Sequence, residues 1–315
     1  MRTFIQKDAS LSAIEYIQLN FLVTFISVLI AMVAMLIGVA FLSLFERKLM
    51  GTVQYRLGPN KVSGFYGICQ PFSDAIKLAS KQNPFPNSGE SFLYSIAPVA
   101  MCFIYLSAWC IPLSFVCPSS KGLIILLVLL SCSALWQAVS GWAAHSSFSE
   151  IGSIRAIAQS VSFEIILSMS MLTFMFLSTS SMSNLNESGS LWLGSLNLLV
   201  TWMLTLALLA ESGRSPFDLP EGESELVGGY LVDYGGSLYM LIFLAENLSC
   251  LLIAGIMSFV CIHPLNWCKC LTITVIIILI RSAMPRISFR DMMPIVWIMF
   301  MPSVISAMSL SVIMI

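Results

Sequence analysis

Long runs of apolar residues recur along the chain and dominate its pattern. An α-helix needs about 20 apolar residues to cross a bilayer. Runs of that kind lie near residues 20–45, 92–115, 122–144, 152–178, 189–210, 236–260, 268–284 and 294–314. The seventh is the weakest, because Lys269 and Arg281 leave only eleven uncharged residues between them. The pattern predicts an all-α polytopic membrane protein with about eight transmembrane helices, folded as a single membrane domain over residues 1–315.

Composition supports a membrane protein and argues against a soluble one. Hydrophobic residues make up 58% of the 315 residues and charged residues only 10%, whereas a globular domain carries about 25% charged residues. The net charge of −1 and the absence of a dense basic cluster argue against a nucleic-acid partner. Neither the P-loop pattern nor the dinucleotide-binding glycine pattern occurs, so no nucleotide site is predicted. The first apolar run, Tyr16–Phe45, is too long for the core of a signal peptide.

The nine cysteines do not indicate a disulfide framework or an iron–sulfur site, because no C-x-x-C pair is present. Cys261, His263, Cys268 and Cys270 are close in sequence and are residue types that bind metals. Their spacing matches no common zinc pattern. We therefore interpret this segment as a connecting loop, and no metal site is predicted.

The distribution of Lys and Arg among the connections predicts that the N-terminus and the C-terminus both lie on the outer side of the membrane, because basic residues gather in the inner connections. With both termini on the outer side, the inner side holds eleven basic residues and the outer side four. The inner residues are Arg47, Lys48, Arg56, Lys61, Lys77, Lys81, Arg155, Arg214, Arg281, Arg286 and Arg290, and the outer ones are Arg2, Lys7, Lys121 and Lys269. The predicted inner connections include two long loops, 46–90 and 211–235. Within the first, Pro71–Lys81 has the pattern of a short amphipathic helix, suited to the membrane interface or to a partner's surface.

An acid-rich stretch, residues 211–233, interrupts the apolar pattern on the predicted inner side. It contains six carboxylates and a single base, Arg214; the acids are Glu211, Asp218, Glu221, Glu223, Glu225 and Asp233. Mutual repulsion and desolvation move carboxylate pKa values toward neutrality, where a group can take up and release protons. The ordinary alternative is a solvated acidic loop. The ionisable residues inside the neighbouring apolar runs favour a functional role.

Two of those ionisable residues, Glu164 and Glu246, lie near the middle of predicted transmembrane helices. Insertion of such a group costs about 2.5–3.5 kcal/mol, so each should face protein or water. Arg155 and Gln159 share one face of the fourth predicted helix while Glu164 points elsewhere, which argues against a simple Arg155–Glu164 pair. Together with the acidic stretch, these residues indicate a route for protons or ions.

Three functional classes fit a membrane bundle of this kind. The first is a proton or ion path within an energy-coupled complex, the second is a stand-alone secondary transporter that binds a cation, and the third is a structural anchor. A transporter usually shows internal repeats, but the acid-rich loop has no counterpart in the first half of the chain. A structural anchor would leave the buried acids unexplained.

Several motifs, in one order along the chain, resemble those of a known family. They are Glu46-Arg47-Lys48 followed by Gln54, Arg56 and Gly58-Pro59-Asn60, then QPFSDAIKL at 70–78, SGWAAHS at 140–146, IGSIRAIAQSVSFEI at 151–165, RSPFDLPEGESELVGGY at 214–230, FLAEN at 243–247 and RSAMPR at 281–286. They resemble the signatures of subunit 1 of respiratory NADH:ubiquinone oxidoreductase (complex I). The resemblance covers essentially the whole chain after residue 20. Related subunits occur in ion-pumping, membrane-bound hydrogenases, which remain an alternative.

The resemblance implies a role in ubiquinone binding and proton translocation, without a redox centre in this chain. NADH, FMN and iron–sulfur clusters would lie on other subunits, and loops 46–90 and 211–235 would face the hydrophilic arm. The residues implied at the ubiquinone site are Arg47, Arg56, Asp74, Arg214, Phe217, Arg281 and Arg286. Those implied in the proton route are Glu164, Glu211, Asp218, Glu221, Glu223, Glu225, Asp233 and Glu246.

Several positions depart from the family pattern. Asp233 stands where Glu is usual, and Asn247 stands where Tyr is expected after Glu246. Ser288 and Arg290 replace a base and an acid, and Ile298 replaces a Lys. The Met-, Ser- and Phe-rich composition favours the mitochondrial inner membrane over a bacterial plasma membrane. Other complex I subunits and lipid are the expected partners.

Overall fold

The computed structural model describes residues 2–62, 66–86, 90–111, 122–177, 198–220, 222, 227–262 and 267–314, with side chains described for these except 2–22, 24, 175–177, 259–262, 267 and 311–314. These residues form helices joined by loops, with no strand among them. The elements are α1 (Arg2–Val53), α2 (Gln70–Ser80), α3 (Ser91–Trp109), α4 (Gly122–Ala144), α5 (Ser147–Leu177), α8 (Leu198–Glu211), the 3₁₀ turn η1 (Gly229–Leu231), α10 (Gly236–Ile262), α11 (Trp267–Ala283), α12 (Phe289–Pro294), the π-helical turn η2 (Ile295–Phe300) and α13 (Met301–Met314).

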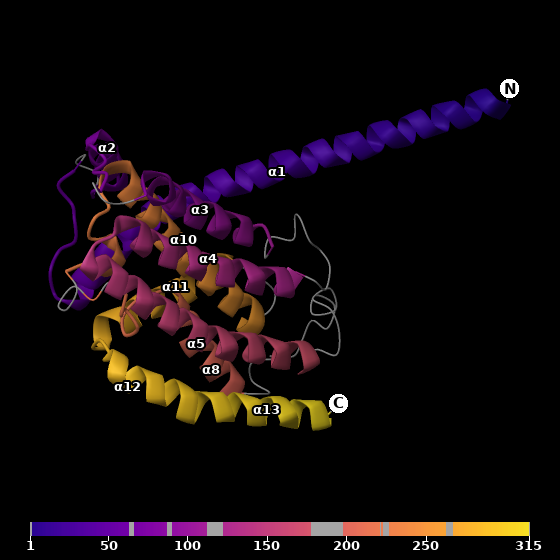
Figure 1. Ribbon diagram of the computed structural model, residues 1–315. Coiled ribbons are helices and arrows are strands. Elements are labelled where there is room, and N and C mark those ends of the chain that lie inside the picture. Colours follow the sequence, from indigo (N-terminus) through magenta and orange to yellow (C-terminus); the bar gives the residue numbers. More distant parts are fainter. Residues whose placement is uncertain are drawn as a thin grey trace.

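The prediction of an all-α membrane protein is confirmed. A helix occupies each of the eight predicted positions, although 189–197 lies outside the described residues. Six helices are long and apolar enough to cross a membrane: Phe25–Val53, Ser91–Trp109, Gly122–Ala144, Ser147–Phe174, Gly236–Ser258 and Phe289–Leu310. The described part of α8 is shorter, and α11 has 17 residues and contains Lys269 and Arg281. Consecutive long helices run in opposite directions, and both chain ends lie at the same end of the bundle, to the right in Figure 1.

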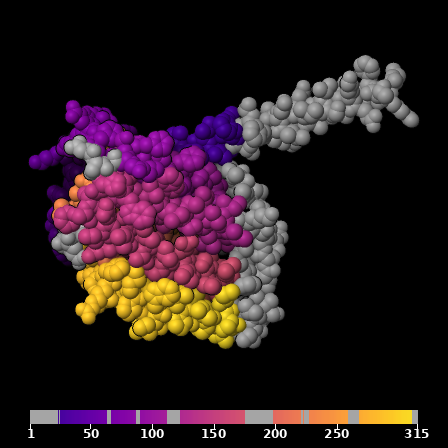
Figure 2. Space-filling model, viewed as in Figure 1, coloured from indigo at the N-terminus to yellow at the C-terminus, as the bar shows by residue number. Residues whose placement is uncertain are grey.

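Helix α10 forms the centre of the bundle and α1 its edge. In the most apolar part of each, 67% of the α10 residues are buried but only 17% of the α1 residues. α10 packs against α3, α11 and α1, and α5 packs against α4, α8 and α13. A helix that is apolar on all sides must be buried on all sides or face lipid. α10 meets the first condition, and we expect α1 to meet the second. Figure 1 shows α1 leaving the bundle at an angle, and Figure 2 shows α13 beside α5 on one face.

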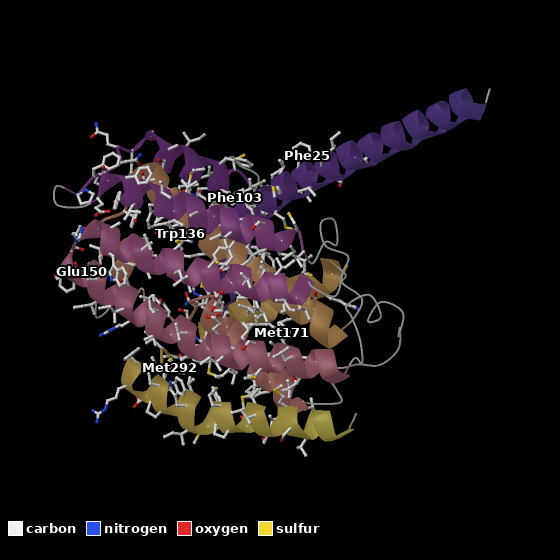
Figure 3. All side chains as sticks on the ribbon, turned by 45° about the vertical axis from the view of Figure 1, so that its right-hand side comes forward. Phe25, Phe103, Trp136, Glu150, Met171 and Met292 are labelled. Carbon is white, nitrogen blue, oxygen red and sulfur yellow. The ribbon has the colours of Figure 1, made fainter. Side chains whose placement is uncertain are left out.

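Close packing fixes α10 against its neighbour α3. The Trp109 indole donates to the Leu248 carbonyl at 3.4 Å. A Cβ at Gly255 would lie 3.1 Å from the same indole ring, so a small residue is needed at this contact. On the outer surface, Phe25 of α1 and Phe103 of α3 are exposed and point away from the bundle (Figure 3), as expected for side chains that face lipid.

The loops that end α1 and precede α10 lie together at the left of Figure 1, beside α2. The predicted amphipathic helix is present as α2, with Pro71 buried and Phe72 and Ile76 exposed. The Asn83 carboxamide accepts a hydrogen bond from the Ser237 backbone N–H at 2.9 Å. This bond satisfies one of the free N–H groups at the start of α10 and ties the first long loop to the central helix.

Candidate functional site

A cavity of about 500 Å³ opens where α1, α5, α8, α10 and α11 meet the loop that follows α8. Its volume lies within the usual range for small-molecule sites. Six of the predicted site residues line it: Arg47, Glu211, Arg214, Asp218, Glu246 and Arg281. Three of these were predicted for ubiquinone binding and three for the proton route. The structure therefore brings the two predicted groups together around one cavity.

One side of the cavity carries two arginines that share a single carboxylate, and we call Glu46, Arg214 and Arg281 the basic cluster. Arg214 Nη1 donates to Glu46 Oε1 at 2.5 Å, and Arg281 Nη1 donates to the same oxygen. The Glu46 and Arg214 side chains are largely buried, at 9% and 12% exposure. These three residues hold one more positive charge than negative. The excess charge faces the cavity, because all three residues line it.

The charge on Arg214 is secured by its partners. Burial alone would lower the pKa of this guanidinium, but the charge and hydrogen bond of Glu46, together with other neighbouring groups such as Glu246, raise the pKa above its usual value. Arg214 Nη2 also donates to Asn247 Oδ1 at 2.8 Å. Arg214 is therefore a fixed, permanently charged donor at the cavity wall.

Another side of the cavity is acidic and contains hydroxyl groups. The Tyr230 hydroxyl donates to Glu246 Oε1 at 2.6 Å. Tyr105 hydrogen-bonds to Ser133 and lies within electrostatic reach of both Glu211 and Glu246. We call the cavity-lining residues Glu211, Glu246, Tyr105 and Tyr230, together with Glu164, which lies behind Glu211 and does not line this cavity, the acidic wall.

Glu164 lies beyond Glu211 in a second, much smaller cavity between α4, α5 and α8. That cavity has about 10 Å³ of space and is lined by Leu127, Leu130 and Leu167 in addition to the two glutamates. This is close to the smallest volume that accommodates one water molecule. Glu211 lines both cavities, so it lies between the large cavity and the small one, where Glu164 is its neighbour.

Local backbone features place Tyr230 and Glu211 at the cavity. Gly228 and Gly229 have φ values of 153° and 56°, which favour glycine. A Cβ at Gly152 would lie only 2.7 Å from the Tyr230 backbone nitrogen, so η1 packs directly against α5. Gln159 Nε2 donates to the Ala210 and Phe217 carbonyls, each at 2.8 Å. This amide holds the end of α8 to the turn that carries Asp218.

The remaining predicted residues lie around the cavity or away from it. Arg286 does not line the cavity but donates to Asp218 Oδ2 at 2.7 Å. Phe217 is buried, with its ring edge-on to Phe163 at 5.3 Å between centroids. Asp233 accepts a hydrogen bond from the Ser146 hydroxyl, and its backbone carbonyl accepts one from the Tyr94 hydroxyl. These contacts fasten the loop before α10 to α3 and to the turn before α5.

Arg47, Arg56 and Asp74 form a more exposed extension of the site. Arg47 lines the large cavity and makes an ion pair of 2.8 Å with Asp74, and both side chains are at least 36% exposed. Arg47 and Arg56 also line a third cavity, of about 270 Å³. Glu221, Glu223 and Glu225 lie outside the described residues. No group of metal-binding side chains occurs within the described part of the chain, which excludes the Cys261 and His263 side chains.

Five residues that the description of the site uses were absent from the predicted set: Glu46, Tyr105, Gln159, Tyr230 and Asn247. Glu46 is the one whose sequence position most clearly indicated a role at the site, because it is an acid that directly follows a 30-residue run without charge. The other four carry polar groups in or beside apolar segments, and their sequence positions do not reveal which neighbours they bind.

Comparisons with known proteins agree with the motifs. A family model described as NADH dehydrogenase matches residues 26–312, which include every residue that lines the large cavity. NADH-ubiquinone oxidoreductase chain 1 of Aedes aegypti is 34% identical over 297 residues, covering 90% of this chain and 93% of that protein. The protein of the same name from Sarcophilus harrisii is 35% identical over 299 residues, with 88% and 92% covered. A bacterial relative, an NADH-quinone oxidoreductase subunit of Bordetella avium (strain 197N), is 32% identical over 315 residues, with 89% and 87% covered.

Proposed function

The chain belongs to the NADH dehydrogenase family and is a complex I membrane subunit, and from this premise we propose that it forms the membrane part of a ubiquinone chamber and the acidic start of a proton route. The observation that carries the proposal is the single cavity that joins the basic cluster to the acidic wall. A site that reduces a quinone must stabilise negative charge on oxygen and must also supply protons. The two sides of this cavity offer those two properties.

The basic cluster suits the quinone headgroup. Reduction of a quinone to a quinol adds two electrons and two protons, and electron density increases first on the carbonyl oxygens. Arg214 and Arg281 are fixed by Glu46 and still hold one positive charge in excess. Oriented donors of this kind, away from bulk water, stabilise developing negative charge without having to reorganise. The electrons would come from an iron–sulfur cluster on a neighbouring subunit.

The acidic wall suits the proton route. Glu246 and Glu211 line the quinone cavity, and Glu211 is shared with the smaller cavity that holds Glu164. A change of charge at the headgroup alters the proton affinity of nearby carboxylates. We assign proton uptake and transfer to these acids, and place Glu221, Glu223, Glu225 and Asp233 on the same route because of their positions in the acidic stretch.

The loops at this end of the bundle suit contact with the hydrophilic arm. Tyr55 and Leu57 in the first loop are 100% and 88% exposed, and Phe72 and Ile76 on α2 are also exposed. Apolar residues grouped in this way mark partner surfaces. We propose that loops 46–90 and 211–235 face the subunits that carry the electrons, with both termini on the opposite side of the mitochondrial inner membrane. A bacterial plasma membrane is the alternative location.

The central test replaces one cationic side chain of the cavity. In the membrane complex that contains this chain, Arg281→Met removes a donor while Arg214 still pairs with Glu46. We expect the KM for a short-chain ubiquinone to rise at least about tenfold, because hydrogen bonds to charged groups contribute about 1.5–3 kcal/mol. NADH oxidation by ferricyanide, which needs no quinone site, should stay unchanged. An unchanged KM would refute the assignment of the basic cluster to quinone binding.

Purification in mild detergent tests the family alternatives. A large complex with flavin and iron–sulfur clusters supports the proposal, whereas nickel in place of flavin supports the hydrogenase relative. A single active chain without redox partners would instead support a secondary transporter.

A further inference from the structure

Asn247 occupies an unusual position for an amide, at the centre of the most buried helix. It is fully buried in α10 and lies next to Glu246. Its Nδ2 donates to the Phe243 carbonyl at 2.8 Å, and its Oδ1 accepts from Arg214 Nη2 at 2.8 Å. A carbonyl can only accept and a guanidinium can only donate. The two partners therefore fix the orientation of the amide, with its oxygen toward Arg214.

The Asn247 contact completes the support of Arg214. Glu46 Oε1 is shared between Arg214 and Arg281, so this carboxylate alone would hold each guanidinium through a single oxygen. Asn247 binds the second terminal nitrogen of Arg214. Two partners on two different helices, α1 and α10, then restrict the guanidinium to one orientation. Arg214 itself lies in the loop after α8, so no helix fixes the position of its backbone.

The charge of this second partner matters as much as its position. Glu46 already offsets one of the two arginines, and Glu246 lies within electrostatic reach of Arg214. A second carboxylate in contact with Arg214 would remove the positive excess of the basic cluster. A neutral amide binds Arg214 and leaves that excess in place. An apolar side chain would leave the charge but would also leave a buried guanidinium N–H without its acceptor.

We propose that Asn247 is a positioning residue for quinone reduction: it holds the Arg214 guanidinium at the cavity wall without neutralising it. The inference rests on the proposed function, since it assumes that Arg214 acts on the quinone. It goes further by separating two properties of Arg214, orientation and net charge, and by assigning both to one neutral side chain on α10. The competing explanation is that Asn247 is an ordinary buried polar residue whose bonds only stabilise the fold.

The test uses three substitutions of Asn247 in the assembled complex. Asn247→Leu has a similar size and removes both hydrogen bonds. Asn247→Ser is too short to reach Arg214, but its hydroxyl can still donate to the Phe243 carbonyl, four residues earlier in the helix. Asn247→Asp keeps the acceptor for Arg214 and adds a negative charge. Ser258→Ala is the matched control, because Ser258 is also a fully buried polar residue of α10, but its hydroxyl contacts the Gly255 carbonyl and Cys270 Sγ and not the basic cluster.

The three variants should separate an effect on KM from an effect on kcat. We expect Asn247→Leu and Asn247→Ser to raise the KM for a short-chain ubiquinone about tenfold, because Arg214 loses its orientation. Asn247→Asp should mainly lower kcat, because Arg214 stays held while the charge excess is lost. Ferricyanide reduction should be unchanged in every variant, and Ser258→Ala should match the unmodified complex. If the leucine variant does not assemble, the serine variant decides the outcome.

An Arg214→Met variant separates failure of this inference from failure of the proposed function. If Asn247 acts through Arg214, adding Asn247→Ser to Arg214→Met should change KM no further. The positioning role is overturned if Arg214→Met raises KM while the Asn247 variants resemble Ser258→Ala, or if the two substitutions are additive. The proposed function itself fails at this cluster if Arg214→Met leaves KM unchanged.

Discussion

The two sides of the cavity hold their carboxylates in different ways. In the basic cluster, Glu46 lies between two guanidinium groups, and a proton on this acid would leave two cations, of which Arg214 is largely buried, without this counter-charge. On the acidic wall, Glu246 is bound by the hydroxyl of Tyr230. A hydroxyl can donate to a carboxylate or accept from a carboxylic acid, so it remains a partner in both protonation states.

This difference separates acids that keep their charge from acids that can change it. Asp218 resembles Glu46, since Arg286 donates to it at 2.7 Å, and Asp74 is paired with Arg47. Glu164 and Glu211 lie together at the small cavity among leucine side chains. No arginine is among the described residues that line this small cavity, in contrast to the surroundings of Glu46 and Asp218. The acidic wall is therefore suited to moving protons, and the arginine-paired acids are suited to fixing the shape and charge of the quinone site.

The largest expected effect comes from breaking the basic cluster at its shared acid. Glu46→Gln should destabilise the subunit, because removing one member of a buried ion pair costs about 3–5 kcal/mol, and here two cations lose their partner. The amount and thermal stability of the assembled complex measure this loss. Asp74→Asn is the control for assembly, since exposed ion pairs contribute about 0–1 kcal/mol. Equal stability of the two variants would contradict a structural role for Glu46.

The second effect tests whether the acidic wall carries protons. Glu164→Gln removes the charge and keeps the shape of the side chain, so we expect fewer protons translocated per electron transferred to quinone. The measurement is the proton-to-electron ratio in sealed vesicles. Glu150→Gln is the matched control, because Glu150 is an exposed acid on the same helix, at the left-hand end of the bundle in Figure 3. Normal turnover with an unchanged ratio would exclude Glu164 from the route.

A smaller effect is expected from the hydroxyl partner of Glu246. Tyr230→Phe keeps the ring and removes a bond worth about 1.5–3 kcal/mol to a charged acceptor, so quinone-coupled turnover should fall severalfold with assembly intact. Tyr94→Phe is the comparison, since Tyr94 is an equally buried phenol outside the cavity that binds the Asp233 carbonyl. If the two variants behave alike, the bond between Tyr230 and Glu246 has no specific role.

The sequence was enough to predict the helices and much of the site. Apolar runs located all eight helical positions, because a bilayer imposes both length and composition on a helix that crosses it. The motifs identified the family, which the comparisons confirm. The six predicted residues that line the cavity come from α1, α8, α10, α11 and one loop.

The pairings could not be predicted, because they depend on tertiary packing. Glu46 and Arg281 are 235 positions apart in the chain, yet they form a hydrogen bond. The bond from Tyr230 to Glu246 depends on a turn with two glycines at positive φ and on the close approach of η1 to Gly152. Asp233 was predicted as part of the proton route, but its contacts are with Ser146 and Tyr94, away from the cavity lining. Its place on that route stays a prediction.

The smallest expected effect concerns the exposed side of the quinone site, where Arg56 lines the third cavity, of about 270 Å³, with Arg47. Because Arg56 is exposed, Arg56→Ala should change stability by no more than about 0.5 kcal/mol. If Arg56 guides or holds quinone at the entrance, the KM and the inhibitor concentration for half-inhibition should still rise by a small factor. Lys61→Ala removes an equally exposed cation from the same loop, outside that cavity, and should leave both quantities unchanged. Identical behaviour of the two variants would restrict the quinone site to the arginines that line the large cavity and leave Arg56 with a general surface role.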